Sequence, residues 1–193
     1  MIEQGSIEPS TDISKYPNII NLNDVETSAG KELTLPLNMK NAEENITAFQ
    51  CDVHLPEGVA WASTIDKRGN VVLTQPTFNA ETERTDDSYH TISPVTQLSD
   101  GSYRIIVYSM AKEIILGKEG AVIDLPLSIS DELEAGEYNI YLKNVVMTDI
   151  NTNQILLDKV VSKLAIPSYT LGDVNDDKMI NVTDVVSVVS YML

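Results

Sequence analysis

Alternation of apolar and polar residues constrains the fold of this chain more than any other feature of its sequence. It is clearest in the stretches Leu33 to Met39, Phe49 to Leu55, Ile123 to Ile129 and Tyr138 to Leu142. Successive side chains of a β-strand point to opposite faces, so a period of two places one face of each strand in a core and the other in water. The sequence therefore predicts strands in sheets that each have one solvated face.

Glycine-containing turns separate these strands along residues 17–166, among them Pro56 to Gly58, Ser99 to Gly101 and Lys118 to Gly120. Many short strands at this spacing are typical of a β-sandwich or jelly roll. Pro36 and Pro126 fall on the outward phase of their strands, a position that an edge strand tolerates. We therefore predict an all-β jelly-roll β-sandwich over residues 17–166.

Three segments lack this alternation. Residues 1–16 are polar and aperiodic, and we expect a flexible lead-in. Residues 76–98 form a polar insertion that we expect to be a long loop. Residues 167–193 are expected to contain a linker followed by a short loop and a helix.

Composition limits the class of partner. The chain has 193 residues, with 13 lysines and arginines against 29 aspartates and glutamates, a formal net charge of −16. Such a surface repels nucleic acid and anionic membranes, so we expect neither as a partner. No stretch approaches the roughly twenty apolar residues of a membrane span, so no membrane insertion is expected. The single cysteine, Cys51, excludes an internal disulfide.

Oxygen-bearing residues near the C-terminus follow the spacing of an EF-hand calcium loop. Alternate residues of such a loop point inward and supply the six to eight oxygens that Ca²⁺ requires. With Asp173 as loop position one, the predicted ligands of a Ca²⁺ ion are Asp173, Asn175, Asp177, the carbonyl of Met179, Asn181 and Asp184. The alternative interpretation of the same residues is an acidic surface turn.

Two positions depart from the standard loop. Lys178 replaces the glycine of position six, which strains the turn and places a positive charge near the ion. Asp184 replaces the glutamate of position twelve and must draw the following helix closer to the ion. That helix is predicted to have one apolar face, formed by Val185, Val186, Val188, Val189, Met192 and Leu193.

Residues 172–184, Gly-Asp-Val-Asn-Asp-Asp-Lys-Met-Ile-Asn-Val-Thr-Asp, resemble one repeat of a dockerin. Dockerins are the calcium-binding half of the cohesin–dockerin pair that assembles bacterial polysaccharide-degrading enzymes. A dockerin normally carries two such repeats, and this chain shows one.

The order of motifs in residues 17–166 is similar to that of a cohesin module. The segments that carry this resemblance are residues 30–39, 46–55, 103–109, 116–120 and 135–149. The resemblance implies a jelly-roll sandwich that binds another cohesin- or dockerin-bearing protein. It also implies a secreted or cell-surface protein, although no signal peptide is visible in the chain.

The sequence argues against an enzyme. No Gly-x-Ser-x-Gly, His-Glu-x-x-His or phosphate-binding glycine motif is present. The two histidines, His54 and His90, are expected to be solvated. Cys51 lies on the inward phase of its strand, and Trp61 is expected in the core rather than on a sugar-binding surface.

Three hypotheses remain open from the residues and the two resemblances together. The first is a non-catalytic assembly protein, in which a cohesin-like sandwich precedes a calcium-stabilised dockerin-like repeat. The second is a carbohydrate-binding module that contacts polysaccharide through the sandwich, because cohesins are related in fold to such modules. The third is a structural spacer whose only ligand is calcium.

Overall fold

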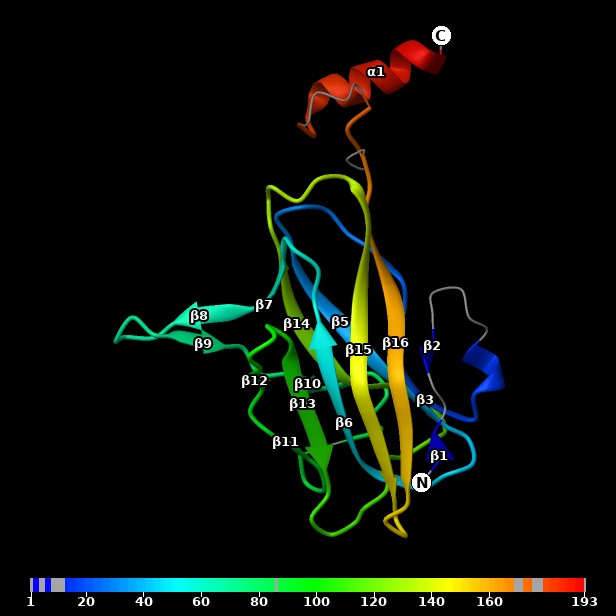
Figure 1. Ribbon diagram of the computed structural model, residues 1–193. Coiled ribbons are helices and arrows are strands. Elements are labelled where there is room, and N and C mark those ends of the chain that lie inside the picture. Colours follow the sequence, from blue (N-terminus) through cyan, green and yellow to red (C-terminus); the bar gives the residue numbers. More distant parts are fainter. Residues whose placement is uncertain are drawn as a thin grey trace.

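Two β-sheets pack face to face in the computed structural model and enclose one hydrophobic core (Figure 1). The structure describes residues 2–3, 6–7, 13–85, 87–168, 172–174 and 179–192. A short helix, α1 (Val182–Met192), follows the sandwich. The predicted all-β jelly-roll sandwich with a short C-terminal helix is confirmed.

The larger sheet has four long antiparallel strands at its centre. In order across the sheet these are β16 (Gln154–Ile166), β15 (Gly136–Asp149), β6 (Ile46–His54) and β13 (Tyr103–Tyr108). Short strands complete both edges. β1 (Ile2–Glu3), β2 (Ser6–Ile7) and β4 (Val25–Glu26) pair with β16 in parallel, and β11 (Thr91–Ile92) and β12 (Thr96–Gln97) pair with β13.

The smaller sheet covers the inner face of the larger one. Its strands are β10 (Thr77–Phe78), β14 (Glu119–Ile129), β5 (Glu32–Asn41) and β3 (Asn18–Leu22), with β7 (Val59–Trp61) beside β14. A separate hairpin of β8 (Ser63–Ile65) and β9 (Val71–Leu73) projects from the side of the sandwich (Figure 1).

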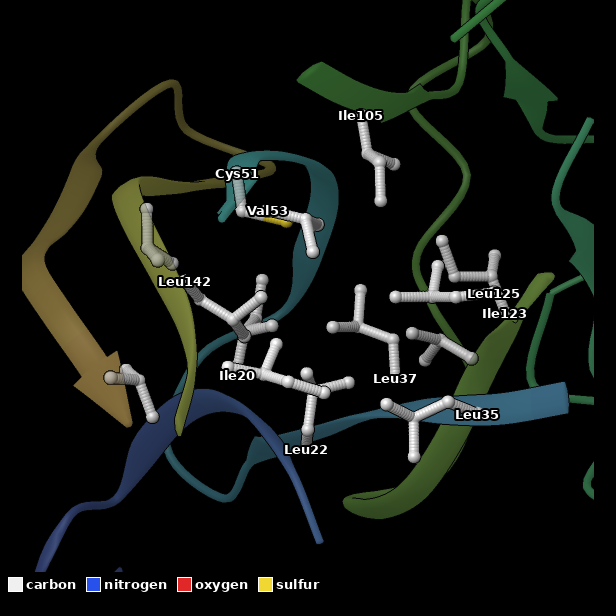
Figure 2. Close-up of a cluster of buried hydrophobic side chains, with 14 of the residues drawn as sticks. Ile20, Leu22, Leu35, Leu37, Cys51, Val53, Ile105, Ile123, Leu125 and Leu142 are labelled. Carbon is white, nitrogen blue, oxygen red and sulfur yellow. The ribbon is translucent and has the colours of Figure 1, made fainter. Parts of the chain in front are cut away.

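The inward phase of the predicted alternation forms the core. Figure 2 shows Leu35 and Leu37 of the smaller sheet facing the side of the core formed by Val53 and Ile105 of the larger sheet. Cys51 and Trp61, 0% and 2% exposed, belong to the same core, as predicted. Trp61 donates its indole N–H to the carbonyl of Thr74 at 2.7 Å, which satisfies its only polar group.

The two strand prolines lie outward as predicted, but their strands are not edge strands. β5 lies between β14 and β3, and β14 lies between β5 and the short strands β10 and β7. Pro36 stands one residue beyond the part of β5 that pairs with β3. Pro126 falls in the gap between the residues of β14 that pair with β10 and those that pair with β7. Each proline therefore occupies a local edge, where its missing N–H removes no ladder bond.

The insertion at residues 76–98 is more ordered than its polarity suggested. It contains β10, β11 and β12, and it buries His90, which is 4% exposed. The expectation of a solvated His90 was wrong. Arg84 explains the order: its guanidinium donates to the carbonyls of Leu116, Met39 and Gly120 and pins the insertion against the smaller sheet.

The two ends of the chain differ in how they meet the sandwich. Where the sequence suggested a flexible lead-in, β1 and β2 pair with β16, and a 3₁₀ turn covers Ile13–Lys15. α1 lies beyond the end of the sandwich, past the last residue of β16 (Figure 1). No helix of the described residues is long and apolar enough to span a bilayer. The predicted boundaries at residues 16/17 and 166/167 stay predictions.

Candidate functional site

The outer face of the larger sheet is one of the two sheet surfaces that the core leaves free. Strand register aligns its outward residues in rows across β13, β6, β15 and β16. One row, called here the apolar row, consists of Ile106, Gln50, Val146 and Leu156. All four side chains are half-buried, so three aliphatic groups remain partly open to solvent.

A second row is charged, and it lies two residues further along β13 and β6 and three residues further along β15 and β16. This charged row consists of Arg104, Asp52, Lys143 and Lys159. Asp158, which precedes Lys159, is also exposed. The row thus gathers three cations on the surface of a chain whose formal net charge is −16.

Asp52 organises the charged row. Its Oδ1 accepts a hydrogen bond from Arg104 Nε at 2.7 Å, and its Oδ2 accepts from Arg104 Nη2 at 2.8 Å. Asn144 Nδ2 donates to the same Oδ2 at 2.8 Å. Asp52 is 1% exposed, and this burial opposes ionisation of its carboxyl group, but the bonds from Arg104 and Asn144 and the charge of Arg104 outweigh it. The pKa of Asp52 is therefore below its usual value.

A β-bulge brings Asn144 to this position. The pairing of β15 with β6 shifts register between Lys143 and Val146, and Asn144 has a φ of 49°. An extra residue in one strand produces such a shift, and asparagine tolerates a positive φ better than most residues. The bulge therefore turns the Asn144 amide towards Asp52 on the neighbouring strand.

Tyr141 lies close to both lysines of the charged row. Lys143 Nζ lies 5.9 Å and Lys159 Nζ 5.8 Å from the centre of the Tyr141 ring, within the range of cation–π attraction. His54 pairs with Tyr141 across β6 and β15. Burial lowers the pKa of His54, and repulsion from Lys143 lowers it further, so His54 is neutral at physiological pH.

The predicted calcium loop is described in part. Asp173 is half-buried, Met179 and Asn181 are exposed, and Asp184 is 3% exposed. Asn175 and Asp177 lie outside the described residues. Among the described residues, no three His, Cys, Asp or Glu side chains are grouped closely enough to bind a metal ion.

Asp184 closes the described part of the loop. Its Oδ1 accepts from the backbone N–H of Val174 at 2.8 Å, and its Oδ2 accepts from that of Asn181 at 2.7 Å. The last predicted ligand thus reaches back to the loop's beginning. The predicted donors are all oxygens, the ligand type that Ca²⁺ prefers, so the residues present fit that ion.

The same residues start α1. Asn181 precedes the first helical residue, and its Oδ1 accepts from the backbone N–H of Thr183 at 2.8 Å. The Asn181 N–H in turn donates to the Asp184 side chain, so the N-cap residue and the third helical residue are joined as well. Asp184 therefore holds the loop and the helix start in one unit.

Comparison with known proteins identifies the family. The model of the Cohesin domain matches residues 20–166. The chain belongs to the cohesin family. This assignment agrees with the resemblance of residues 17–166, and the match ends at residue 166, before the predicted dockerin-like repeat. A search of curated proteins finds no match.

Solved cohesin structures share this fold at low sequence identity. A type I cohesin in complex with a dockerin from Clostridium thermocellum has a TM-score of 0.55 and 12% identity, covering 76% of this chain and 98% of that one. The cohesin module of a Clostridium perfringens family 33 glycoside hydrolase has a TM-score of 0.55 and 14% identity, covering 78% and 95%. A non-cellulosomal cohesin from Archaeoglobus fulgidus has a TM-score of 0.54 and 11% identity, covering 83% and 98%. At such identities the likeness shows the fold alone.

Sequence reasoning missed the two rows of the outer face. The outward phase of each strand was recognised as solvated, but rows depend on register between strands as far apart in sequence as β6 and β15. The one available signal was apolar residues on the outward phase, such as Ile106 and Val146.

Proposed function

We propose that this protein is a non-catalytic, protein-binding module of an extracellular or cell-surface assembly, and that its partner carries a dockerin. The observation that carries the proposal is membership of the cohesin family over residues 20–166. Two of the similar structures are cohesin–dockerin complexes from Clostridium thermocellum. They support a dockerin as the partner class.

The apolar and charged rows on the outer face of the larger sheet form the proposed binding surface. Protein interfaces bury an apolar centre within a polar rim, and the apolar row beside the charged row offers both. The outward residues of the smaller sheet are prolines and polar residues instead, namely Glu32, Thr34, Pro36, Asn38, Lys40, Asp124, Pro126 and Ser128. Of the two outer faces, that of the larger sheet is therefore better suited to a protein partner.

The outer face is also rigid, which lowers the entropic cost of binding. Each of the four central strands pairs with a neighbour on both sides, and the Arg104–Asp52–Asn144 bonds tie three of them together. Arg104 uses Nε and Nη2 for Asp52, and its side chain stays 36% exposed. A fixed, half-exposed arginine is a frequent hot spot of protein interfaces.

The loop before α1 is proposed to bind one Ca²⁺ ion through Asp173, Asn175, Asp177, the carbonyl of Met179, Asn181 and Asp184. The support is the oxygen-only donor set, together with the position of Asp184 across the described part of the loop. When bound, the ion would neutralise carboxylates that otherwise repel one another. The resemblance of residues 172–184 to a dockerin repeat remains part of this proposal.

The test of the proposed function is a binding screen. The purified chain is immobilised and exposed, in millimolar calcium, to purified dockerin modules from its source organism and, separately, to insoluble polysaccharides. We expect saturable binding of at least one dockerin and no retention by polysaccharide. Polysaccharide retention without dockerin binding would replace this proposal by the carbohydrate-binding alternative. The structure offers that alternative no exposed tryptophan on which a sugar ring could stack, because Trp61 is buried.

A further inference from the structure

Lys143 occupies an electrostatically unfavourable position in the charged row. Its side chain is half-buried on β15, and the sheet register places it opposite Lys159 on one side and Asp52 on the other. Asp52 uses both of its carboxylate oxygens for Arg104 and Asn144. The salt bridges found among the described residues do not include Lys143.

This position costs stability. Like charges directly opposite each other on neighbouring strands destabilise a sheet, and a half-buried ammonium group loses part of its hydration. The Tyr141 ring offsets part of the cost, but it lies 5.9 Å from Lys143 Nζ and 5.8 Å from Lys159 Nζ, so the two ammonium groups stay within about 12 Å of each other. Residues that violate the rules of stable packing are expected at functional sites. An anionic group from a partner would relieve the repulsion.

Arg104 adds a second cationic donor to this part of the face. Its Nε and Nη2 bind Asp52, which leaves Nη1 outside that pair, and its side chain stays 36% exposed. Asp52 lies between Arg104 and Lys143 in the register, so its single negative charge is flanked by two positive charges. With Lys159, the charged row carries three positive charges and one negative charge, in a chain whose formal net charge is −16. The excess of cations is therefore a local feature of this face.

The apolar row lies beside these cations at a fixed distance. Along β13 and β6 the two rows are two residues apart, which corresponds to about 7 Å. An interface that places its apolar centre on Ile106 and Val146 therefore brings its polar rim onto Arg104 and Lys143. A partner carboxylate about 7 Å from the partner's own apolar centre would meet these two cations.

We propose that the charged row selects an acidic partner. The dockerin that binds this face carries an aspartate or glutamate that pairs with Lys143, next to the apolar residues that cover Ile106 and Val146. A dockerin with a lysine or arginine at that position is rejected, because like charges would meet in a partly desolvated rim. The inference rests on the proposed function and deepens it, since it names the charge that the partner must carry and the residue that reads it.

The experiment measures, by calorimetry, the affinity of the dockerin that binds the wild type most tightly in the binding screen. Lys143→Glu should weaken binding at least tenfold, because the partner carboxylate then meets a like charge. Lys143→Gln, which only removes the charge, should weaken it roughly two- to fivefold. Raising NaCl from about 0.05 M to about 0.5 M should weaken the wild type more than Lys143→Gln, because salt screens exposed charges. Lys31→Glu, the same change of charge at an exposed position next to β5, should bind as the wild type does.

A charge exchange identifies the partner carboxylate. Each aspartate and glutamate of that dockerin outside its calcium ligands is replaced by lysine in turn, and one of these variants should bind Lys143→Glu at least tenfold more tightly than the unmodified dockerin does. A misfolded Lys143→Glu would bind none of them, and the salt series then decides, because equal salt dependence of the wild type and Lys143→Gln overturns the inference.

The remaining outcomes separate this inference from the proposed function. Unchanged affinity of a folded Lys143→Glu, an equal loss in Lys31→Glu, or the absence of any rescuing dockerin variant overturns the inference and leaves dockerin binding in place. A wild type that binds no dockerin removes the proposed function and the inference with it.

Discussion

Arg104 and Asp52 face each other across β13 and β6 and form a salt bridge with two hydrogen bonds, to which Asn144 adds a third from β15. The partners are 52 and 92 residues from Asp52 in sequence. The salt bridge therefore joins strands that are far apart in sequence, on the surface where we propose that the partner binds.

Replacing Asp52 by asparagine should lower the free energy of unfolding at neutral pH by about 1–3 kcal/mol, because the replacement leaves Arg104 without its counter-charge. The folded-state pKa of Asp52 is below its unfolded value of about 3.9. The stabilisation is thus complete above that unfolded value and is lost as the pH falls through the folded pKa. Urea unfolding of both proteins over a pH series should show that the difference between their free energies of unfolding becomes smaller in acid. The exposed Asp158→Asn is the control, and a deficit that does not change with pH would contradict the assignment.

Arg84 should be among the most important single residues for stability. It is 4% exposed and donates four hydrogen bonds, three to carbonyls and one to Asn41 Oδ1 at 2.5 Å. Arg84→Met keeps most of the aliphatic volume but leaves these acceptors without their hydrogen-bond donor. The free energy of unfolding, measured by chemical denaturation, should fall by about 3–5 kcal/mol. The matched change at the exposed Arg68 should stay within about 0.5 kcal/mol. Equal effects at the two positions would remove Arg84 as the anchor of the insertion.

The Cys51 thiol should be inert in the folded protein. Burial, reinforced by the charge of Asp52, raises the pKa of Cys51 to about 12, and only the thiolate is nucleophilic. A thiol reagent at mildly alkaline pH should modify Cys51 only after denaturant is added. Rapid modification of the native protein would mean that the core opens at this strand.

Calcium titration by calorimetry tests the loop. We expect one site in the wild type and none in the Asp173→Ala, Asp184→Ala double variant. Glu57→Ala, which removes an acid from a turn of the sandwich, should bind as the wild type does. Equal heats from the double variant and the wild type would leave the loop as an acidic surface turn.

The parts of the fold that depend on short-range pattern could be predicted from the sequence. Alternation identified the strands and assigned Cys51 to the core, and the spacing of valines identified α1. Pro36 and Pro126 show the limit of this reasoning. Their outward phase is a property of one strand, whereas the absence of a neighbour beside each proline depends on where β3, β10 and β7 begin and end.

The remaining features arise from long-range contacts. The polar segment 76–98 looked like a solvated loop, but Arg84 and His90 are buried because the segment folds against β5 and β14. The candidate face escaped prediction for the same reason. Nothing local in the sequence indicates that Asn144 stands in a bulge, or that its amide meets a carboxylate 92 residues away.

The central claim is that the outer face of the larger sheet binds the partner. Its most direct test is the affinity of a dockerin that binds the wild type, measured by calorimetry for three chains. These are the wild type, Ile106→Lys with Val146→Lys on the outer face, and Thr34→Lys on the opposite sheet. The account predicts a loss of at least a hundredfold for the face variant, because two lysines would have to be desolvated in the centre of the interface. It predicts no change for Thr34→Lys. Equal affinity in all three chains, or a loss confined to Thr34→Lys, would place the partner elsewhere and contradict the account.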